Sequence, residues 1–168
     1  MLAGVAALVL TLLAKPAPRP SEVAVVKRVI DGDTLELKDG RKVRLLGVDT
    51  PELHHPKKAV EAFAEAAKKF TSEAVADKTV RLVFEKWNPS DRYGRLLAYV
   101  YREPDGFFLN RELLAAGFAH TEVRWPFARM NEFRALERQA RDSERGLWGR
   151  GEGTHVPGDR PVHPNDHF

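Results

Sequence analysis

The chain has 168 residues, no cysteine and a formal net charge of +3 at pH 7. This length and an apolar content of 43% are sufficient for one domain with a buried core. The absence of cysteine excludes a disulfide framework, a thiol nucleophile and cysteine-ligated metal. The slight excess of basic residues suits a polyanionic partner but does not identify one.

The N-terminal segment differs in composition from the rest. Residues 1–14 are almost wholly apolar, and residues 15–20 are rich in proline. A helix needs about 20 apolar residues to span a bilayer, so this length favours a signal-peptide core over a permanent anchor. No basic residue precedes the run, so a buried N-terminal helix is the alternative interpretation. We expect residues 1–20 to be a signal peptide or anchor with a linker, and the protein to be secreted or extracytoplasmic. A membrane would be a partner only if this segment is retained.

The β-branched and alternating segments predict strands. The first three are expected at residues 23–30, 34–38 and 42–48, and two more at 79–84 and 96–101. Between the second and third, Asp39-Gly40 predicts a tight hairpin.

Helical periodicity follows the third strand. Helices are expected at residues 57–76, 109–116 and 131–145. Five short strands with a helix after the third predict an α+β fold, an OB-fold five-stranded Greek-key β-barrel with three α-helices, over residues 21–149. Residues 150–168 are rich in glycine, proline and histidine and are expected to form a disordered tail, in which the histidines are solvated and bind no metal.

Acidic residues gather where the predicted strands meet. Asp31 and Asp33 follow the first strand, and Asp49 follows the third. The hairpin brings Asp33 and Asp49 to the same open end, and oxygen ligands of this kind suit a hard cation such as Ca²⁺. The pattern leaves open which face each side chain takes, because a one-residue slip in register would reverse it.

These segments resemble the staphylococcal nuclease (thermonuclease) family over residues 26–148. The resemblance is carried by Val29-Ile-Asp-Gly-Asp-Thr34, Val43-Arg-Leu-Leu-Gly-Val-Asp-Thr-Pro-Glu52, His55-Pro-Lys-Lys58 and Asp91-Arg-Tyr-Gly-Arg-Leu-Leu-Ala-Tyr99. Leu109-Asn-Arg-Glu-Leu-Leu-Ala-Ala-Gly117 and Gly146-Leu-Trp148 look like the closing helices of the family. The order of these motifs makes a chance match implausible.

The resemblance implies a Ca²⁺ site. Asp33 and Asp49 would bind the ion through their carboxylates and Thr50 through its backbone carbonyl. Asp31 would lie just outside these ligands.

The resemblance also implies a catalytic set. Glu52 would be the general base that activates water, and Arg44 and Arg95 would bind the scissile phosphate and its transition state. The chemistry is sound because a phosphodiester needs a cation and rigid donors for the charge that develops, and arginine supplies planar donors that stay charged.

Four further residues are candidates for substrate binding. Tyr93 matches a family position at the terminal phosphate, with packing of its loop as the alternative. Lys57 and Lys58 border the family's substrate groove, or only begin a helix. Family tyrosines that line the nucleotide pocket are replaced here by Val123 and Trp125. Tryptophan can stack on a base, whereas valine cannot.

Each motif taken alone has an ordinary structural reading. The Asp31-Gly-Asp-Thr34 segment is a common turn composition, and Asp49-Thr-Pro-Glu52 could cap a helix. Arg95 could belong to a solvated loop. The motifs in combination favour function.

The resemblance thus implies a Ca²⁺-dependent, sugar-nonspecific endo- and exonuclease. It would hydrolyse DNA and RNA to 3′-phosphate and 5′-hydroxyl ends, as a monomer with no obligate protein partner. The alternative is a noncatalytic nucleic-acid or protein-binding module of the same fold. Such modules typically lack the acidic ligands and the base, which are present here.

Overall fold

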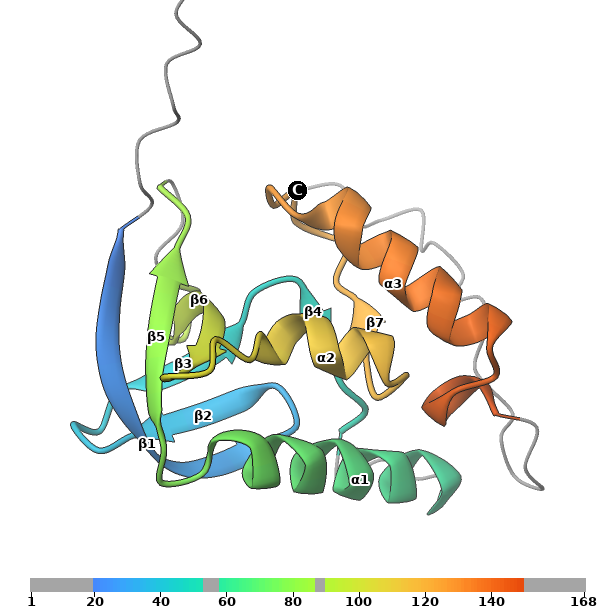
Figure 1. Ribbon diagram of the computed structural model, residues 1–168, viewed down its shortest axis with the longest axis horizontal. Helices are drawn as coiled ribbons and strands as arrows, with labels where there is room; N and C mark the ends of the chain where they lie inside the picture. The colour runs from blue at the N-terminus through green and yellow to red at the C-terminus, as the bar shows by residue number, and fades with distance from the viewer. Residues whose placement is uncertain (1–19, 53–57, 87–89, 150–168) are drawn as a thin grey trace, which may run out of the picture.

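A closed barrel of five strands forms the centre of the computed structural model, which describes residues 20–52, 58–86 and 90–149. The strands are β1 (Ser21–Asp31), β2 (Thr34–Leu37), β3 (Lys42–Leu45), β5 (Thr79–Phe84) and β6 (Leu96–Arg102). They pair in the order β1-β2-β3-β6-β5 (Figure 1). Only β3 and β6 are parallel, and every other pair is antiparallel. The predicted five-stranded barrel is confirmed.

Strand β1 closes the barrel because it pairs on both sides. Its first half, from Ser21 to Val25, lies beside β5, and its second half, from Val26 to Asp31, lies beside β2. The register with β2 shifts twice along that second half. Such irregularities bend a strand and increase its twist, which lets one long strand serve two neighbours.

The hairpin of β2 and β3 settles which side chains point inward. Val43 and Leu45 are buried in the barrel core, so Arg44 between them projects from the opposite face. The turn at Asp39-Gly40 is as predicted, and Gly40 has a φ of +88°, which favours glycine. Register and turn together direct Arg44 away from the core.

The expected third strand, residues 42–48, is divided in two. It ends at Leu45, and the chain resumes as β4 (Val48–Asp49), which pairs with β7 (His120–Thr121) in a separate two-stranded sheet. Gly47 lies between with a φ of +76°, and a Cβ there would be 2.5 Å from the ring of Phe127. The break therefore depends on a contact with a residue far away in the sequence.

In the view of Figure 1, one helix runs below the barrel and the other helices lie to its right. They are α1 (Lys58–Val75), α2 (Leu109–Ala115) and α3 (Met130–Asp142), followed by the short 3₁₀ helix η1 (Gly146–Trp148). The third helix ends before the expected residue 145. The chain leaves it through Glu144, which has a φ of +51°. Helix α2 lies between the barrel and α3 and contacts both.

One apolar core joins the barrel to these helices. Tyr99 of β6 and Phe133 of α3 are fully buried, and their rings meet edge to face at 6.1 Å. In residues 20–52, 58–86 and 90–149, no helix is long and apolar enough to cross a membrane. The predicted signal or anchor segment and the C-terminal tail lie outside the described residues, so the proposed domain limits stay predictions.

Candidate active site

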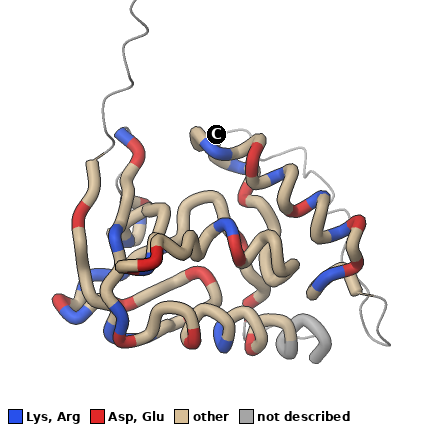
Figure 2. The backbone as a smooth tube through the Cα atoms, in the orientation of Figure 1, with Lys and Arg blue, Asp and Glu red and all other residues tan. Residues whose placement is uncertain are grey.

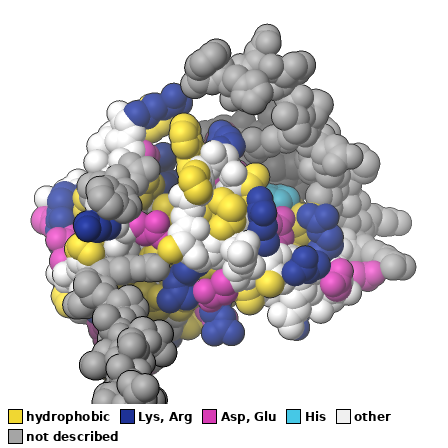
Figure 3. Space-filling view, turned by 90° about the horizontal axis from the view of Figure 1, so that it is seen from above, with side chains coloured by type: hydrophobic (Ala, Val, Ile, Leu, Met, Phe, Trp, Pro, Cys, Tyr) yellow, Lys and Arg dark blue, Asp and Glu magenta, His cyan; other side chains and the backbone are white. Residues whose placement is uncertain are grey.

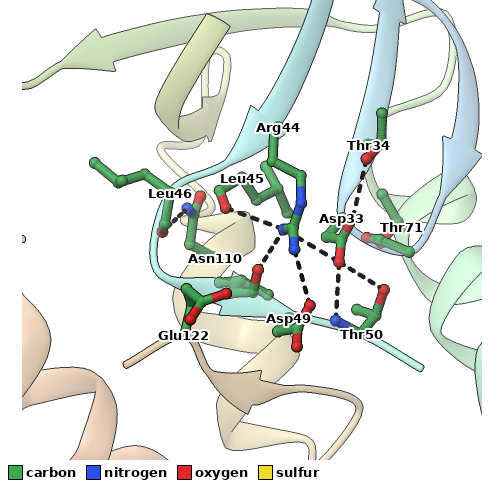
Figure 4. Close-up of polar contacts among 12 residues, drawn as sticks. Asp33, Thr34, Arg44, Leu45, Leu46, Asp49, Thr50, Thr71, Asn110 and Glu122 are labelled. Atoms are coloured by element: carbon green, nitrogen blue, oxygen red, sulfur yellow. Dashed lines mark hydrogen bonds and ion pairs between the residues drawn. The ribbon is translucent and has the colours of Figure 1, made fainter. Parts of the chain in front are cut away.

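One guanidinium lies between the two carboxylates that the sequence predicts as metal ligands. Arg44 places Nη1 3.1 Å from Asp33 Oδ2 and Nη2 3.0 Å from Asp49 Oδ1 (Figure 4). Its Nη1 also donates to the carbonyl oxygens of Val48 and Leu45. Asp33 just before β2, Arg44 near the end of β3 and Asp49 at the end of β4 are thus brought together.

Asp33 is held by several donors. Thr50 donates its backbone N–H and its hydroxyl to Asp33 Oδ2, at 2.8 and 2.9 Å, and the Thr34 hydroxyl donates to Oδ1 at 3.0 Å. Thr50 therefore lies beside the predicted ligand. The ligand role of its carbonyl stays a prediction.

Helix α1 supports the turn that carries Asp33. The fully buried Thr71 donates its hydroxyl to the Gly32 carbonyl at 2.6 Å. A Cβ on Gly32 would lie 2.8 Å from Thr50 Cγ2 and 2.9 Å from Ala67. The close approach of α1 and Thr50 therefore requires glycine at position 32. Because Thr50 can come this close to the turn, it reaches the Asp33 carboxylate.

The small β4–β7 sheet positions Asp49. His120 is the ladder partner of Asp49, and the Glu122 backbone N–H donates to the Gly47 carbonyl at 3.1 Å. From α3, Glu137 accepts a hydrogen bond from the Thr121 backbone at 3.1 Å and lies 3.4 Å from His120 Nδ1. Helix α3 is thereby connected through β7 to the active-site carboxylate.

The acidic side chains at this end of the barrel have perturbed pKa values. Burial raises the pKa of Asp31, and the neighbouring charge of Asp33 raises it further. Burial also raises the pKa of Asp49; the attraction of Arg44 lowers it and repulsion from Asp33 and Glu122 raises it, so that it lies above the ordinary value. Folding therefore makes both carboxyl groups easier to protonate, and burial is the leading cause.

The donor chemistry at this end fits a hard cation. Asp31 Oδ1 is buried and has no hydrogen-bond partner among the described residues. Asp33 and Asp49 supply further carboxylate oxygens, the ligand type that Ca²⁺ prefers. Within the described part of the chain, however, no three histidine or acidic side chains are already arranged around one metal position. Arg44 lies between the carboxylates instead.

The other predicted catalytic residues lie in two separate loops. Glu52 is exposed, three residues after Asp49. Arg95 donates its Nε–H to Asp91 Oδ2 at 2.7 Å, just before β6 begins. Burial raises the pKa of Asp91, but the hydrogen bonds from Arg95 and from the Tyr93 backbone lower it below the ordinary value. Asp91 therefore holds the Arg95 guanidinium through its Nε.

Two predicted substrate-binding residues are among the most exposed aromatic side chains. Tyr93 is 68% exposed and Trp125 is 70% exposed. Arg92 and Arg95 lie 4.8 and 5.4 Å from the centroid of the Tyr93 ring, and Arg92 donates to its hydroxyl. Lys57 and the side chain of Lys58 lie outside the described residues. The substrate roles of all four residues stay predictions.

Three polar residues that the sequence analysis did not single out complete the setting. Asn110 of α2 is fully buried, donates to the Leu46 carbonyl at 2.9 Å and accepts the Val100 N–H at 2.9 Å. Glu122 points toward the Arg44 cluster in Figure 4, and Glu137 holds β7. A polar residue at an apolar position of a helix was the available signal for Asn110. No local pattern identifies the two glutamates.

Residues 42–150 match the family model described as staphylococcal nuclease homologue. The chain belongs to the staphylococcal nuclease family. It is 38% identical over 136 residues to a thermonuclease of Staphylococcus intermedius, a match that covers 77% of each chain. It is 36% identical over 127 residues to a thermonuclease of Staphylococcus hyicus, with 73% of each chain covered. It is also 38% identical to endonuclease YncB of Bacillus subtilis, over 73% of this chain and 60% of that protein. The resemblance expected from the motifs is confirmed.

Proposed function

We propose that this protein is a Ca²⁺-dependent nuclease that cleaves DNA and RNA, within a strand and from its ends, to 3′-phosphate and 5′-hydroxyl products. Membership of the staphylococcal nuclease family makes it a hydrolase of the nuclease class. The observation that carries the proposal is the Arg44 guanidinium held between Asp33 and Asp49. The metal, the two sugars and the bond that is cut go beyond the names of the relatives.

The engagement of Arg44 gives a reason to propose a cation. Both of its terminal nitrogens contact Asp33 or Asp49. A further positive partner for these carboxylates would free both terminal nitrogens of Arg44 to bind a phosphate. Ca²⁺ bound to Asp33, Asp49 and the Thr50 carbonyl would supply that charge and would stabilise the negative charge that develops on the phosphate.

The remaining residues supply proton transfer and orientation. Glu52 is exposed to solvent, and its carboxylate would take the proton of the attacking water. Arg95 uses Nε for its contact with Asp91, so its terminal amino groups can donate to phosphate oxygens. Two arginines around one phosphate would stabilise the transition state more than the ground state, because the transition state carries the greater charge.

Cleavage of labelled single-stranded DNA and RNA tests the proposal. We expect cutting with Ca²⁺, little or none with Mg²⁺ or a chelator, and products that end in 3′-phosphate. Cutting that survives the chelator would reject the metal requirement, and 5′-phosphate products would reject the assigned bond. A folded protein that binds DNA but cuts nothing would be a noncatalytic module.

The base assignment has its own test. Glu52→Gln keeps the shape of the side chain but removes its basicity, so we expect turnover to fall about 10²–10⁴-fold with little change in substrate binding. Glu65→Gln, at an exposed position of α1, is the matched control. Equal turnover in the two variants would reject Glu52 as the base.

We also propose that the apolar residues 1–14 direct the protein out of the cytoplasm, as a cleaved signal or as an anchor. N-terminal sequencing of protein recovered from the medium and from the membrane fraction separates the two. Protein found only in the cytoplasm with residues 1–14 intact would contradict both.

A further inference from the structure

Helix α3 carries a row of arginines on one side. Arg134, Arg138 and Arg141 are spaced by four and three residues, so they follow one another along a single face. All three are exposed. Figure 2 shows basic and acidic residues mixed along this helix, and Glu137 and Asp142 lie at positions that flank the arginine row.

Two of the three acidic residues of α3, Glu132 and Glu137, contact residues outside the row. Glu132 accepts a hydrogen bond from Arg129 at 2.8 Å, and Glu137 is turned toward His120 and Thr121. Arg141 lies 3.6 Å from Glu137 and 4.3 Å from the centre of the Trp148 ring. Within residues 20–52, 58–86 and 90–149, no ion pair is found for Arg134 or Arg138. These two guanidinium groups remain available to a partner.

Helix stability accounts for Arg138 only in part, through Asp142 four residues later, and does not account for Arg134. Arg134 and Arg138 are four residues apart, and like charges at this spacing destabilise a helix. Neither residue contributes to the apolar core. Their arrangement therefore suits recognition of an external anion better than folding.

The row begins close to the active site. Arg141 neighbours Glu137, Glu137 contacts His120, and His120 is the ladder partner of Asp49. Figure 3 shows Lys and Arg side chains gathered beside the one described histidine, His120. Arg138 and Arg134 lie on the same helix, one residue after and three residues before Glu137.

We propose that this arginine row binds the phosphodiester backbone of the nucleic-acid substrate away from the bond that is cut. From Arg134 to Arg141 the helix rises by about 10 Å, the length occupied by about three phosphates of one strand of a duplex. The occupant is a polyphosphate backbone because the row offers three positive charges in line, two of them without an ion pair among the described residues. This inference rests on the proposed nuclease function and extends its substrate site to long chains.

The test uses the full chain and two double variants of equal charge change. Arg134→Gln with Arg138→Gln removes two members of the row. Lys42→Gln with Arg111→Gln is the matched control, since both residues are exposed and lie on β3 and α2. Binding of a labelled duplex is measured by fluorescence anisotropy in chelator, so that the result does not depend on cleavage. Cleavage of a long duplex and of a dinucleotide is measured separately with Ca²⁺.

For the row variant we expect duplex binding about three- to tenfold weaker than for the control, with the slope of log K against log salt reduced by about 1 to 2. The ratio of kcat/KM for the long substrate to that for the dinucleotide should fall by a similar factor. Arg134→Lys with Arg138→Lys should restore most of the binding, because the charge is kept.

Binding and salt slope equal to those of the control would overturn the inference even if the wild-type protein cleaves normally. Absence of wild-type cleavage, with the binding difference intact, would instead reject the nuclease function and leave the arginine row as a nucleic-acid surface. Thermal unfolding of each variant establishes that it is folded.

Discussion

At the scale of single residues, the site holds carboxyl groups that folding partly buries. Arg44 is the cation that contacts both Asp33 and Asp49, and burial together with mutual repulsion raises the pKa values of Asp31 and Asp49. A carboxyl group whose pKa is raised by folding destabilises the folded state at neutral pH. The charge arrangement therefore favours ligand binding over stability.

Replacing Asp31 tests whether its carboxylate destabilises the folded protein. Burial and the charge of Asp33 raise its folded pKa above the unfolded value, so its penalty is present at neutral pH and disappears below the unfolded pKa. In the presence of chelator, we expect Asp31→Asn to raise the free energy of unfolding at pH 7 by about 0.5 to 1 kcal/mol. The gain should vanish near pH 3. Urea unfolding at both pH values measures it.

Asp105→Asn is the control of opposite sign. Arg102 lowers the pKa of Asp105 through a side-chain hydrogen bond, so its stabilising effect is present above the unfolded pKa and is lost as the pH falls through the folded one. A loss of stability in Asp31→Asn at pH 7 would contradict the interpretation of the site as strained by like charges.

At the scale of elements, a two-residue strand, β4, carries Asp49, one of the two predicted metal ligands. Strand β4 has one ladder neighbour, β7, and β7 is fastened to α3 by Glu137. Two short strands supply too few hydrogen bonds to be stable alone. The position of Asp49 therefore depends on the packing of α3.

Glu137→Gln tests this connection. Burial raises the pKa of Glu137, but the hydrogen bonds from His120 and Thr121 together lower it by more, so the pKa lies below the ordinary value. Its contribution is thus present above the unfolded pKa and is lost as the pH falls through the folded pKa. We expect the variant to lose about 1 kcal/mol at pH 7 and less near pH 3. Urea denaturation measures both.

The matched control is Glu132→Gln on the same helix, whose partner Arg129 is on the surface side. We expect a smaller loss there, because exposed ion pairs contribute little. Equal losses at pH 7 in the two variants would show that Glu137 does not hold β7.

At the scale of the whole molecule, one core unites the barrel and the helices. Its buried side chains come from β1 through α3. Near the C-terminal end, the backbones around Gly117 and Gly146 are in direct contact. A Cβ on Gly117 would lie 2.2 Å from the Arg145 carbonyl oxygen, and a Cβ on Gly146 would lie 2.4 Å from the Gly117 carbonyl oxygen. The Leu147 N–H then donates to the Gly117 carbonyl at 2.9 Å.

This arrangement predicts that residues 20–149 fold on their own. A chain limited to this range should unfold at the same urea concentration as the full chain, with a difference below about 0.5 kcal/mol, because the described core lies within it. Chemical denaturation of both chains measures the difference. A clearly lower midpoint for the shorter chain would mean that residues 1–19 or 150–168 contribute to the fold, against the predicted domain limits.

Local patterning predicted most of the elements. The span of β5 was predicted residue for residue, and the Asp39-Gly40 turn and the start of α2 were also correct. These features depend on β-branched alternation, turn chemistry and helical periodicity, which act between near neighbours. The order of the motifs likewise determined the family from the sequence alone.

Other features were decided only by the tertiary structure. The break at Gly47 depends on Phe127, the pairing of β4 with β7 depends on Glu137, and the placement of Arg44 between Asp33 and Asp49 depends on the register of β3. Each of these three features depends on a contact between residues that are not neighbours in the sequence. Because a carboxylate's partners and burial are set by such contacts, the sequence determined which residues are present, and the tertiary structure decided their geometry and charge balance.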